Sequence, residues 1–187
     1  MSERFDLGDT TLAGLRVLQR RPLRDERGYL ERLFCTAELD PLLAGRRIAQ
    51  INHTLTMRRG TVRGMHYQLA PFAETKFVSC VRGEVLDIAI DLRPASATFL
   101  QWHGERLSAE NHRTLVIPEG FAHGFQTLCD DCEMLYFHTA AYAPAAERGL
   151  NPRDPALSIV WPLPITELSE RDAAHPLITS GFSGVQA

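Results

Sequence analysis

The stretch "GTVRGMHYQ", residues 60–68, carries a histidine inside a segment that is otherwise typical of a β-strand. Alternate side chains of a strand share a face, so His66 and Gln68 are expected on the face that also holds Gly64. Strict alternation sends Arg63 to the opposite face, unless Gly64 marks a β-bulge that redirects it. Because most strand histidines are satisfied core groups, the role of His66 depends on what the rest of the chain brings beside it.

The remainder of the chain is also rich in strand signals. Seven further segments are short, rich in β-branched or aromatic residues and bounded by Gly, Pro, Asn or Asp: residues 27–34, 47–55, 75–83, 84–93, 113–120, 123–128 and 133–142. In residues 84–93, apolar side chains fill one face, and the other face alternates apolar residues with Asp87 and Asp91. Connections this short cannot cross over between parallel strands, so the pattern predicts a mostly β, antiparallel sandwich or barrel.

Helical signals are few. A helix is predicted at residues 36–45, and short helical turns are predicted at residues 107–111 and 168–172. No internal repeat or linker divides the chain, so we expect one domain spanning residues 1–187.

Composition narrows the functional classes. The chain is 44% hydrophobic and 23% charged, with a net charge of -3, which does not favour nucleic acid or membrane as a partner. No apolar run approaches the ~20 residues of a membrane span, and the N-terminus lacks a signal-peptide pattern, so a cytoplasmic location is expected. The CxxC pair Cys129 and Cys132 has no second pair at zinc spacing, which favours a structural role.

Two stretches resemble the two motifs of the cupin superfamily. Residues 118–123, "PEGFAH", match P-x-G-x-x-H, and Gly60 and His66 match the start of G-x5-H-x-H…E-x6-G. The resemblance implies a jelly roll. Gln68 replaces the second histidine and Lys76 replaces the glutamate, and an amide and an ammonium make a poor divalent site. We therefore expect no metal, and a pocket suited to acid–base chemistry instead.

A closer resemblance covers nearly the whole chain. The sequence is similar to the dTDP-4-dehydrorhamnose 3,5-epimerase family through an ordered set of short motifs. The motifs are "DERG" (25–28), "VRGMHYQ" (62–68), "GEVLDIAIDLR" (83–93), "LSAEN" (107–111), "IPEGFAHGF" (117–125), "LY" (135–136), "YAPAAE" (142–147), "DP" (154–155), "WP" (161–162) and "LSERD" (168–172). Each motif alone is weak, but the order of the set is specific.

The resemblance implies a reaction and its residues. The family inverts C3 and C5 of a nucleotide-linked 4-keto-6-deoxy sugar through an enolate, without a metal or redox cofactor. By the family pattern His66 is the base and Asp172 orients it. Lys76, supported by His123, faces the enolate oxygen, and Tyr136 is the opposed proton donor. These roles suit the residue types, because imidazole titrates near neutral pH and tyrosine is protonated there.

The same resemblance implies the binding residues and the assembly. Arg27 and Arg63 match residues that hold the pyrophosphate, for which a planar guanidinium is suited. The other family ligand positions are Gln50, Asn52, Glu147 and Arg171. The substrate is expected to be a nucleotide sugar, and the protein is expected to be a homodimer because the family pairs through sheet edges and an N-terminal segment.

At four positions the sequence departs from the family pattern, and these positions concern recognition of the substrate rather than catalysis. They are Arg32 for a glutamate, Ile51 for an aspartate, Phe137 for a lysine and Ala141 for an aromatic residue. They predict nucleotide choice that is relaxed or shifted away from thymidine.

Other readings stay open. The chain could be a single-carbon epimerase of a CDP-, UDP- or GDP-linked keto sugar, or a non-catalytic sugar-nucleotide-binding cupin. A 3,4-ketoisomerase is disfavoured by the pair "RGMHYQ" and "LSERD", and a metal-dependent dioxygenase is disfavoured by Gln68 and Lys76.

Overall fold

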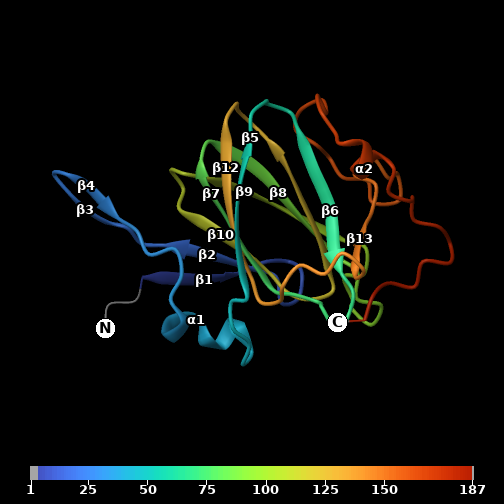
Figure 1. Cartoon of the computed structure of the whole chain (residues 1–187), viewed down its shortest axis with the longest axis horizontal. Coiled ribbons are helices and arrows are strands. Elements are labelled where there is room, and N and C mark those ends of the chain that lie inside the picture. The colour runs from blue at the N-terminus through green and yellow to red at the C-terminus, as the bar shows by residue number, and fades with distance from the viewer. Residues whose placement is uncertain (1–3, 187) are drawn as a thin grey trace.

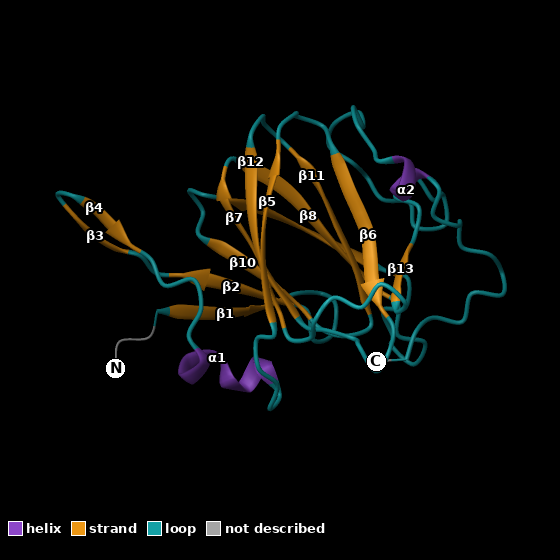
Figure 2. Ribbon diagram, in the orientation of Figure 1, coloured by secondary structure: helices purple, strands orange, loops and turns teal. Residues whose placement is uncertain are grey.

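The computed structural model describes residues 4–186, which form two facing antiparallel β-sheets (Figures 1 and 2). One sheet has six strands in the order β1-β2-β10-β7-β12-β5, and the other has five in the order β13-β6-β11-β8-β9. The strands of the first sheet are β1 (Phe5–Asp9), β2 (Arg16–Arg20), β10 (Arg113–Ile117), β7 (Lys76–Arg82), β12 (Cys132–His138) and β5 (Gln50–Thr56). Those of the second are β13 (Glu147–Gly149), β6 (Val62–Gln68), β11 (Phe121–Thr127), β8 (Glu84–Asp91) and β9 (Trp102–Ser108). The mostly β, cupin-type jelly roll predicted from the sequence is confirmed.

The core is built on both faces of the five-stranded sheet. On β8, Val85 and Ala89 pack between the two sheets, and Ile88 and Ile90 pack into a second cluster on the outer face. The C-terminal segment, red in Figure 1, covers that outer face with side chains that include Leu157. The two-faced pattern of residues 84–93 therefore reflects burial on both sides of one strand.

A bulge in β6 redirects Arg63. Between the pairs His123–His66 and Phe125–Arg63, β6 has one residue more than β11. Gly64 has φ +134°, and a Cβ there would overlap the backbone of Gly124, so only glycine allows the two strands to approach this closely. Because the extra residue reverses the alternation, Arg63 lines the same cavity as His66.

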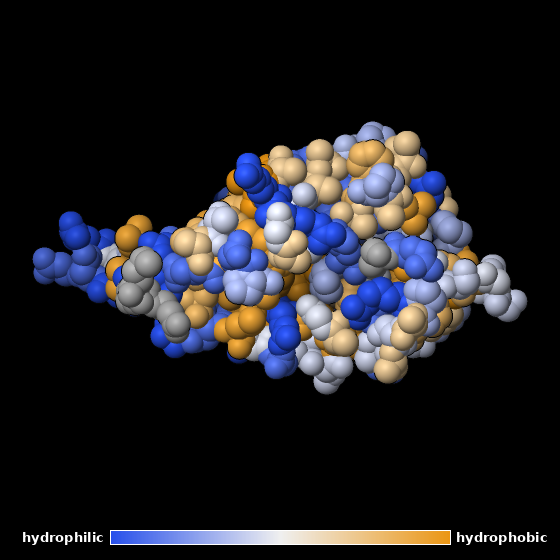
Figure 3. Space-filling model, turned by 90° about the horizontal axis from the view of Figure 1, so that it is seen from below, coloured by the Kyte–Doolittle hydropathy of each residue, from blue (hydrophilic) through white to orange (hydrophobic). Residues whose placement is uncertain are grey.

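A hairpin projects from the body as an arm. It consists of β3 (Leu23–Asp25) and β4 (Gly28–Leu30), and three of its apolar side chains, Leu23, Tyr29 and Leu30, are 47%, 53% and 72% exposed. Seen from below in Figure 3, the arm has a hydrophilic tip. The single strand predicted at residues 27–34 is therefore wrong in its extent, because the chain leaves the strand conformation after Leu30.

The helices are short. α1 (Thr36–Leu43) ends before Ala44, which is left-handed, and before Gly45, which has a positive φ. α2 (Glu170–Ala173) begins after Ser169. The helical turn predicted at residues 107–111 is instead the end of β9 followed by a hydrogen-bonded turn. Across residues 4–186, the helices are too short to reach from one side of a bilayer to the other.

Candidate active site

A cavity of about 1360 Å³ lies between the two sheets. Its walls come from β5, β7 and β12 on one side, from β6 and β11 on the other, and from the segment leading into α2. The cavity brings together ten of the side chains predicted from the sequence: Gln50, Asn52, Arg63, His66, Lys76, His123, Tyr136, Glu147, Arg171 and Asp172. Arg27 lies outside it, on the arm.

His66 is held by Asp172. The Nε2 atom of His66 lies 2.8 Å from Oδ1 of Asp172, and the backbone N–H of Gly64 donates to Oδ2 at 3.1 Å. Burial by itself raises the pKa of Asp172, but the hydrogen bonds from His66 and Gly64 lower it to about 2. An ionised carboxylate only accepts, so Nε2 carries the ring proton and the lone pair of neutral His66 is on Nδ1.

The position of Asp172 follows from a helix cap. The hydroxyl of Ser169 accepts a hydrogen bond from the backbone N–H of Asp172 at 3.0 Å, which fixes the first turn of α2. Asp172 is 3% exposed, so the start of this short helix places a buried carboxylate against β6.

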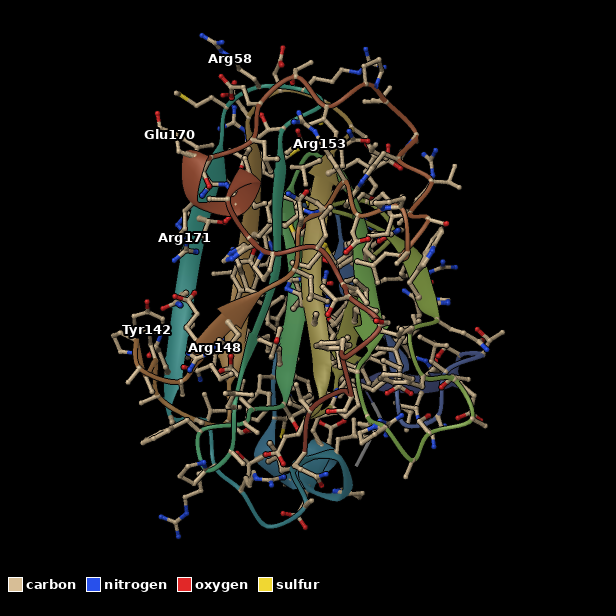
Figure 4. The ribbon with its side chains drawn as sticks, turned by 90° about the vertical axis from the view of Figure 1, so that its right-hand side faces the viewer. Arg58, Tyr142, Arg148, Arg153, Glu170 and Arg171 are labelled. Atoms are coloured by element: carbon tan, nitrogen blue, oxygen red, sulfur yellow. The ribbon has the colours of Figure 1, made fainter. Side chains whose placement is uncertain are left out.

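Arg171 adds a positive charge beside the same pair. Its Nη2 atom lies 3.2 Å from Nε2 of His66, and its Nη1 atom is 3.1 Å from Oε2 of Glu147. The hydroxyl of Tyr142 donates to Glu147 at 2.8 Å. Figure 4 shows Arg171 and Tyr142 on one side of the molecule, below Glu170. These groups form a polar rim next to His66.

His123 has a carboxylate of its own. Its Nε2 atom lies 2.9 Å from both carboxylate oxygens of Asp87, which is fully buried on β8. Burial raises the pKa of Asp87, and the neighbouring His123 opposes that shift. Sequence reasoning noted Asp87 only as a polar residue on an apolar strand, and it missed the partner 36 residues away.

Lys76 and a histidine that sequence reasoning missed share a third carboxylate, that of Glu74. Oε1 of Glu74 lies 3.3 Å from Nζ of Lys76, and Oε2 lies 2.8 Å from Nδ1 of His138. Burial opposes ionisation of Glu74, but His138 and Lys76 hold its pKa below the ordinary value. Strand alternation could have found His138, because it lies two residues after Tyr136 on β12.

Tyr136 lies on the wall opposite His66. Its ring is 6.1 Å from the ring of His123, edge to face, and 6.1 Å from His138, stacked. Burial raises the pKa of Tyr136, whereas the charge of Arg63 acts in the opposite direction. The phenol is therefore protonated at neutral pH, and loss of its proton is made easier by a guanidinium in the same cavity.

The predicted binding residues fall into two groups. Gln50 donates to Asn52 at 3.0 Å on the cavity face of β5, and Arg63 donates from Nε to Thr56 at 2.9 Å. Arg27 forms an ion pair with Asp25 at 2.6 Å at the tip of the arm.

The arrangement can move protons from opposite sides of one bound ring. An imidazole with a free Nδ1 stands on the five-stranded sheet, and a protonated phenol stands on the six-stranded sheet. An ammonium and a second imidazole, those of Lys76 and His123, lie in the same cavity and can stabilise a developing oxyanion.

Comparisons with known proteins agree with this geometry. Residues 9–180 match the family model of dTDP-4-dehydrorhamnose 3,5-epimerase. The chain is 41% identical over 167 residues to a dTDP-4-dehydrorhamnose 3,5-epimerase from Sinorhizobium fredii, covering 89% of this chain and 86% of the relative.

Solved structures share the fold of this chain. A dTDP-4-dehydrorhamnose 3,5-epimerase from Bacillus anthracis, with TDP and PPi bound, superposes with a TM-score of 0.89 and 34% identity over 93% of this chain and 99% of that one. A 3'-monoepimerase from Streptomyces bikiniensis, in complex with dTDP-quinovose, gives a TM-score of 0.82 and 32% identity over 90% and 85% of the two chains. The chain therefore belongs to the dTDP-4-dehydrorhamnose 3,5-epimerase family of isomerases.

Proposed function

We propose that this protein epimerises a nucleotide-linked 4-keto-6-deoxyhexose at C3 and C5, as in the conversion of dTDP-4-dehydro-6-deoxyglucose to dTDP-4-dehydrorhamnose. The observation that carries the proposal is the opposition of His66 and Tyr136 across one cavity. Inversion needs a proton to leave one face of a carbon and another to arrive at the opposite face.

His66 is the base in this proposal. Both C3 and C5 are next to the C4 ketone, so their protons are acidified, and Nδ1 of neutral His66 accepts one of them. The imidazolium that forms is stabilised by Asp172 at 2.8 Å. Tyr136 then gives a proton to the opposite face, and Arg63 stabilises the phenolate that remains.

The enolate between these steps needs a counter-charge. Lys76 supplies a cation and His123 a hydrogen-bond donor for the C4 oxygen, each oriented by its own carboxylate, Glu74 or Asp87. Because these side chains are buried, their charges act in a low-dielectric site without large rearrangement.

We also propose that the protein is a homodimer that completes the nucleotide site. Arg27 stands on an arm outside the cavity of its own chain, and Leu23 and Leu30 of the arm are exposed. A second copy that receives the arm would cover these apolar residues and bring Arg27 to the pyrophosphate held by Arg63 and its neighbours. Sedimentation of wild type and of Leu30→Glu tests the assembly, since a fully active monomer at micromolar concentration would contradict it.

A narrower activity is the alternative. The chain is 32% identical to the 3'-monoepimerase reported above, which supports inversion of one carbon only as the alternative. Hydrogen exchange with solvent separates the two activities, because each carbon that is deprotonated takes up deuterium.

The deciding experiment is a panel of dTDP-, CDP-, UDP- and GDP-linked 4-keto-6-deoxy sugars in deuterated water, followed by NMR. Exchange and inversion at both C3 and C5 support the proposal, and exchange at one carbon supports the monoepimerase. Tight binding of a sugar nucleotide without any exchange would show a binding protein instead.

A further inference from the structure

His175 lies beside the base, although the reaction proposed above gives it no role. Its ring meets that of His66 edge to face, with ring centres 5.7 Å apart. Gly149 makes room for it. This glycine is the register partner of His66 on β13, and a Cβ there would overlap the His175 ring. The missing side chain at Gly149 therefore leaves the space in which a second imidazole packs against the His66–Asp172 pair.

The inner nitrogen of His175 is left without a partner. Its Nε2 atom is buried and makes no hydrogen bond to any of residues 4–186. It points toward the carboxylate of Asp172, 3.8 Å from Oδ1.

Three ligand atoms converge at this point. Nε2 of His66, a carboxylate oxygen of Asp172 and a ring nitrogen of His175 all lie within 4.8 Å of one another. Ligands ~2.0–2.2 Å from a tetrahedral zinc ion are separated by about 3.3 Å. The separations of 2.8 Å and 3.8 Å from Oδ1 of Asp172 to the nitrogens of His66 and His175 bracket that value, and the two histidine nitrogens lie within 4.8 Å of each other, so the rings must move closer to complete the geometry.

We propose that His66, Asp172 and His175 form an inhibitory site for a divalent transition metal such as Zn²⁺, with water as the fourth ligand. Two imidazoles and a carboxylate are a donor set suited to zinc. The site shares His66 with the cupin ligand set, but its other ligands, Asp172 and His175, lie outside the cupin motifs, in which Gln68 and Lys76 stand at ligand positions.

Metal at this site blocks the base through a tautomer change. Neutral His66 carries its proton on Nε2 and keeps Nδ1 free to accept another. When Nε2 binds the metal, the ring proton moves to Nδ1, and no lone pair remains there to remove a substrate proton. Inhibition therefore requires no change elsewhere in the cavity.

Arg171 is the competitor for this site. Its guanidinium lies 3.2 Å from Nε2 of His66 and 3.6 Å from Oδ1 of Asp172, where it repels a cation. The Arg171 side chain is 56% exposed, so it can move into solvent. Glu147 is a further charged residue close to the His175 ring. Arg171→Ala should therefore tighten metal binding, although it also removes a proposed substrate contact.

The direct test uses Co²⁺ and Zn²⁺ on the full-length protein without substrate, because diphosphates chelate divalent ions. Wild type should bind one Co²⁺ per chain with visible d–d absorption typical of a tetrahedral site, and Zn²⁺ should displace it. His175→Phe keeps a ring of similar size without a donor atom. It should weaken Co²⁺ binding at least ~10-fold, the lower end of what even an outer-shell change costs a metal site.

Two matched variants sharpen the result. Gly149→Ala keeps His175 but fills the space that its ring occupies, so it should weaken Co²⁺ binding as His175→Phe does. His53→Ala removes a surface histidine paired with Glu133 at 3.0 Å and should leave binding unchanged. Equal Co²⁺ affinity in wild type and His175→Phe, or weaker affinity in Arg171→Ala, would overturn the proposal.

Inhibition is read separately from binding. The Zn²⁺ concentration that halves each variant's own metal-free rate should rise at least ~10-fold in His175→Phe. Because Co²⁺ binding is measured without turnover, the metal site can be confirmed even if the epimerase proposal fails. Inhibition that is the same in both proteins would place the inhibitory metal elsewhere.

Discussion

His66 and His123 are register partners on the neighbouring strands β6 and β11, yet each is held by a different carboxylate. Asp172 binds His66 from α2, and Asp87 binds His123 from β8. Side chains opposite each other in an antiparallel pair share a face, so both rings line one cavity. In the mechanism proposed above His66 serves as the base and its neighbour His123 as a hydrogen-bond donor, and each imidazole has a carboxylate of its own.

Asp172→Asn tests how far the base depends on its carboxylate. The amide has a similar shape, but it cannot stabilise the imidazolium and it allows the wrong His66 tautomer. We expect turnover to fall by about 10- to 100-fold, less than on removal of the base itself. Rates of wild type and variant measured on the same substrate check this, and an unchanged rate would exclude Asp172 from orienting His66.

Removal of metal should not affect the reaction. The proposed steps use only side chains, and Lys76 occupies the position of a cupin carboxylate ligand. Dialysis against a strong chelator should leave turnover unchanged, or raise it if transition metal occupied the site beside His66. Loss of activity that returns only with added iron, manganese or zinc would contradict the metal-free mechanism.

Local patterns of strand alternation and turn residues predicted the β-rich architecture, whereas most of the site residues were predicted from the resemblance of short motifs to a known family. Strand alternation alone would separate Arg63 from His66, and the sequence left open a bulge at Gly64 that would bring them together; the structure has that bulge, and both side chains line one cavity. The pairing of Glu74 with His138 joins residues 64 apart, and no local pattern contains that information. The contact of His175 with Gly149 likewise depends on packing between β13 and the segment after α2, which no local pattern predicts.

The residues that depart from the family pattern differ in how close they lie to the cavity. Ile51 points outward from β5 and is 58% exposed, and Arg32 pairs with Glu38 near α1. Phe137 packs into a core cluster with Phe77, whereas the carbonyl of Ala141 accepts a hydrogen bond at 3.3 Å from Gln68, a residue of the cavity wall. The loss of a ring at 141 should dominate the predicted shift in nucleotide choice.

Calorimetry with dTDP, CDP, UDP and GDP tests that shift. We expect wild type to show no strong preference for dTDP. Ala141→Tyr should tighten dTDP binding by about fivefold, because one stacked ring contributes on the order of 1 kcal/mol. A wild type that already binds dTDP far more tightly than the other three would show that the missing ring is unimportant.

Asp91 should make folding stability depend on pH. It is fully buried at the end of β8 and accepts hydrogen bonds from Arg93, Ser96 and Thr98. Burial alone would raise the pKa of Asp91, but these bonds lower it to about 2. A folded-state pKa below the unfolded value of ~3.9 stabilises the protein above that pH, and the contribution is lost as pH falls toward 2.

Asp91→Asn removes this contribution. Urea unfolding at pH 7 should show a loss of about 2 kcal/mol, and the difference from wild type should narrow between pH 4 and pH 2. A difference that stays constant over that range would attribute the loss to packing rather than to charge.

Proton abstraction from one face of the sugar and protonation of its opposite face can be tested separately with variants on the two walls of the cavity. His66→Asn keeps a polar group but removes the base, so exchange with solvent and turnover should both fall by at least ~100-fold. Tyr136→Phe removes only the hydroxyl from β12 and leaves His66 and Asp172 in place. Proton abstraction from C3 or C5 should then continue, while return of a proton to the opposite face is impaired.

The Tyr136→Phe protein should therefore incorporate deuterium at a carbon faster than it inverts that carbon. Deuterium uptake and epimer formation followed in the same NMR tube measure both rates. If Tyr136→Phe loses exchange in parallel with inversion, as His66→Asn does, then Tyr136 is needed for abstraction as well, and the assignment of one base and one opposed acid is wrong.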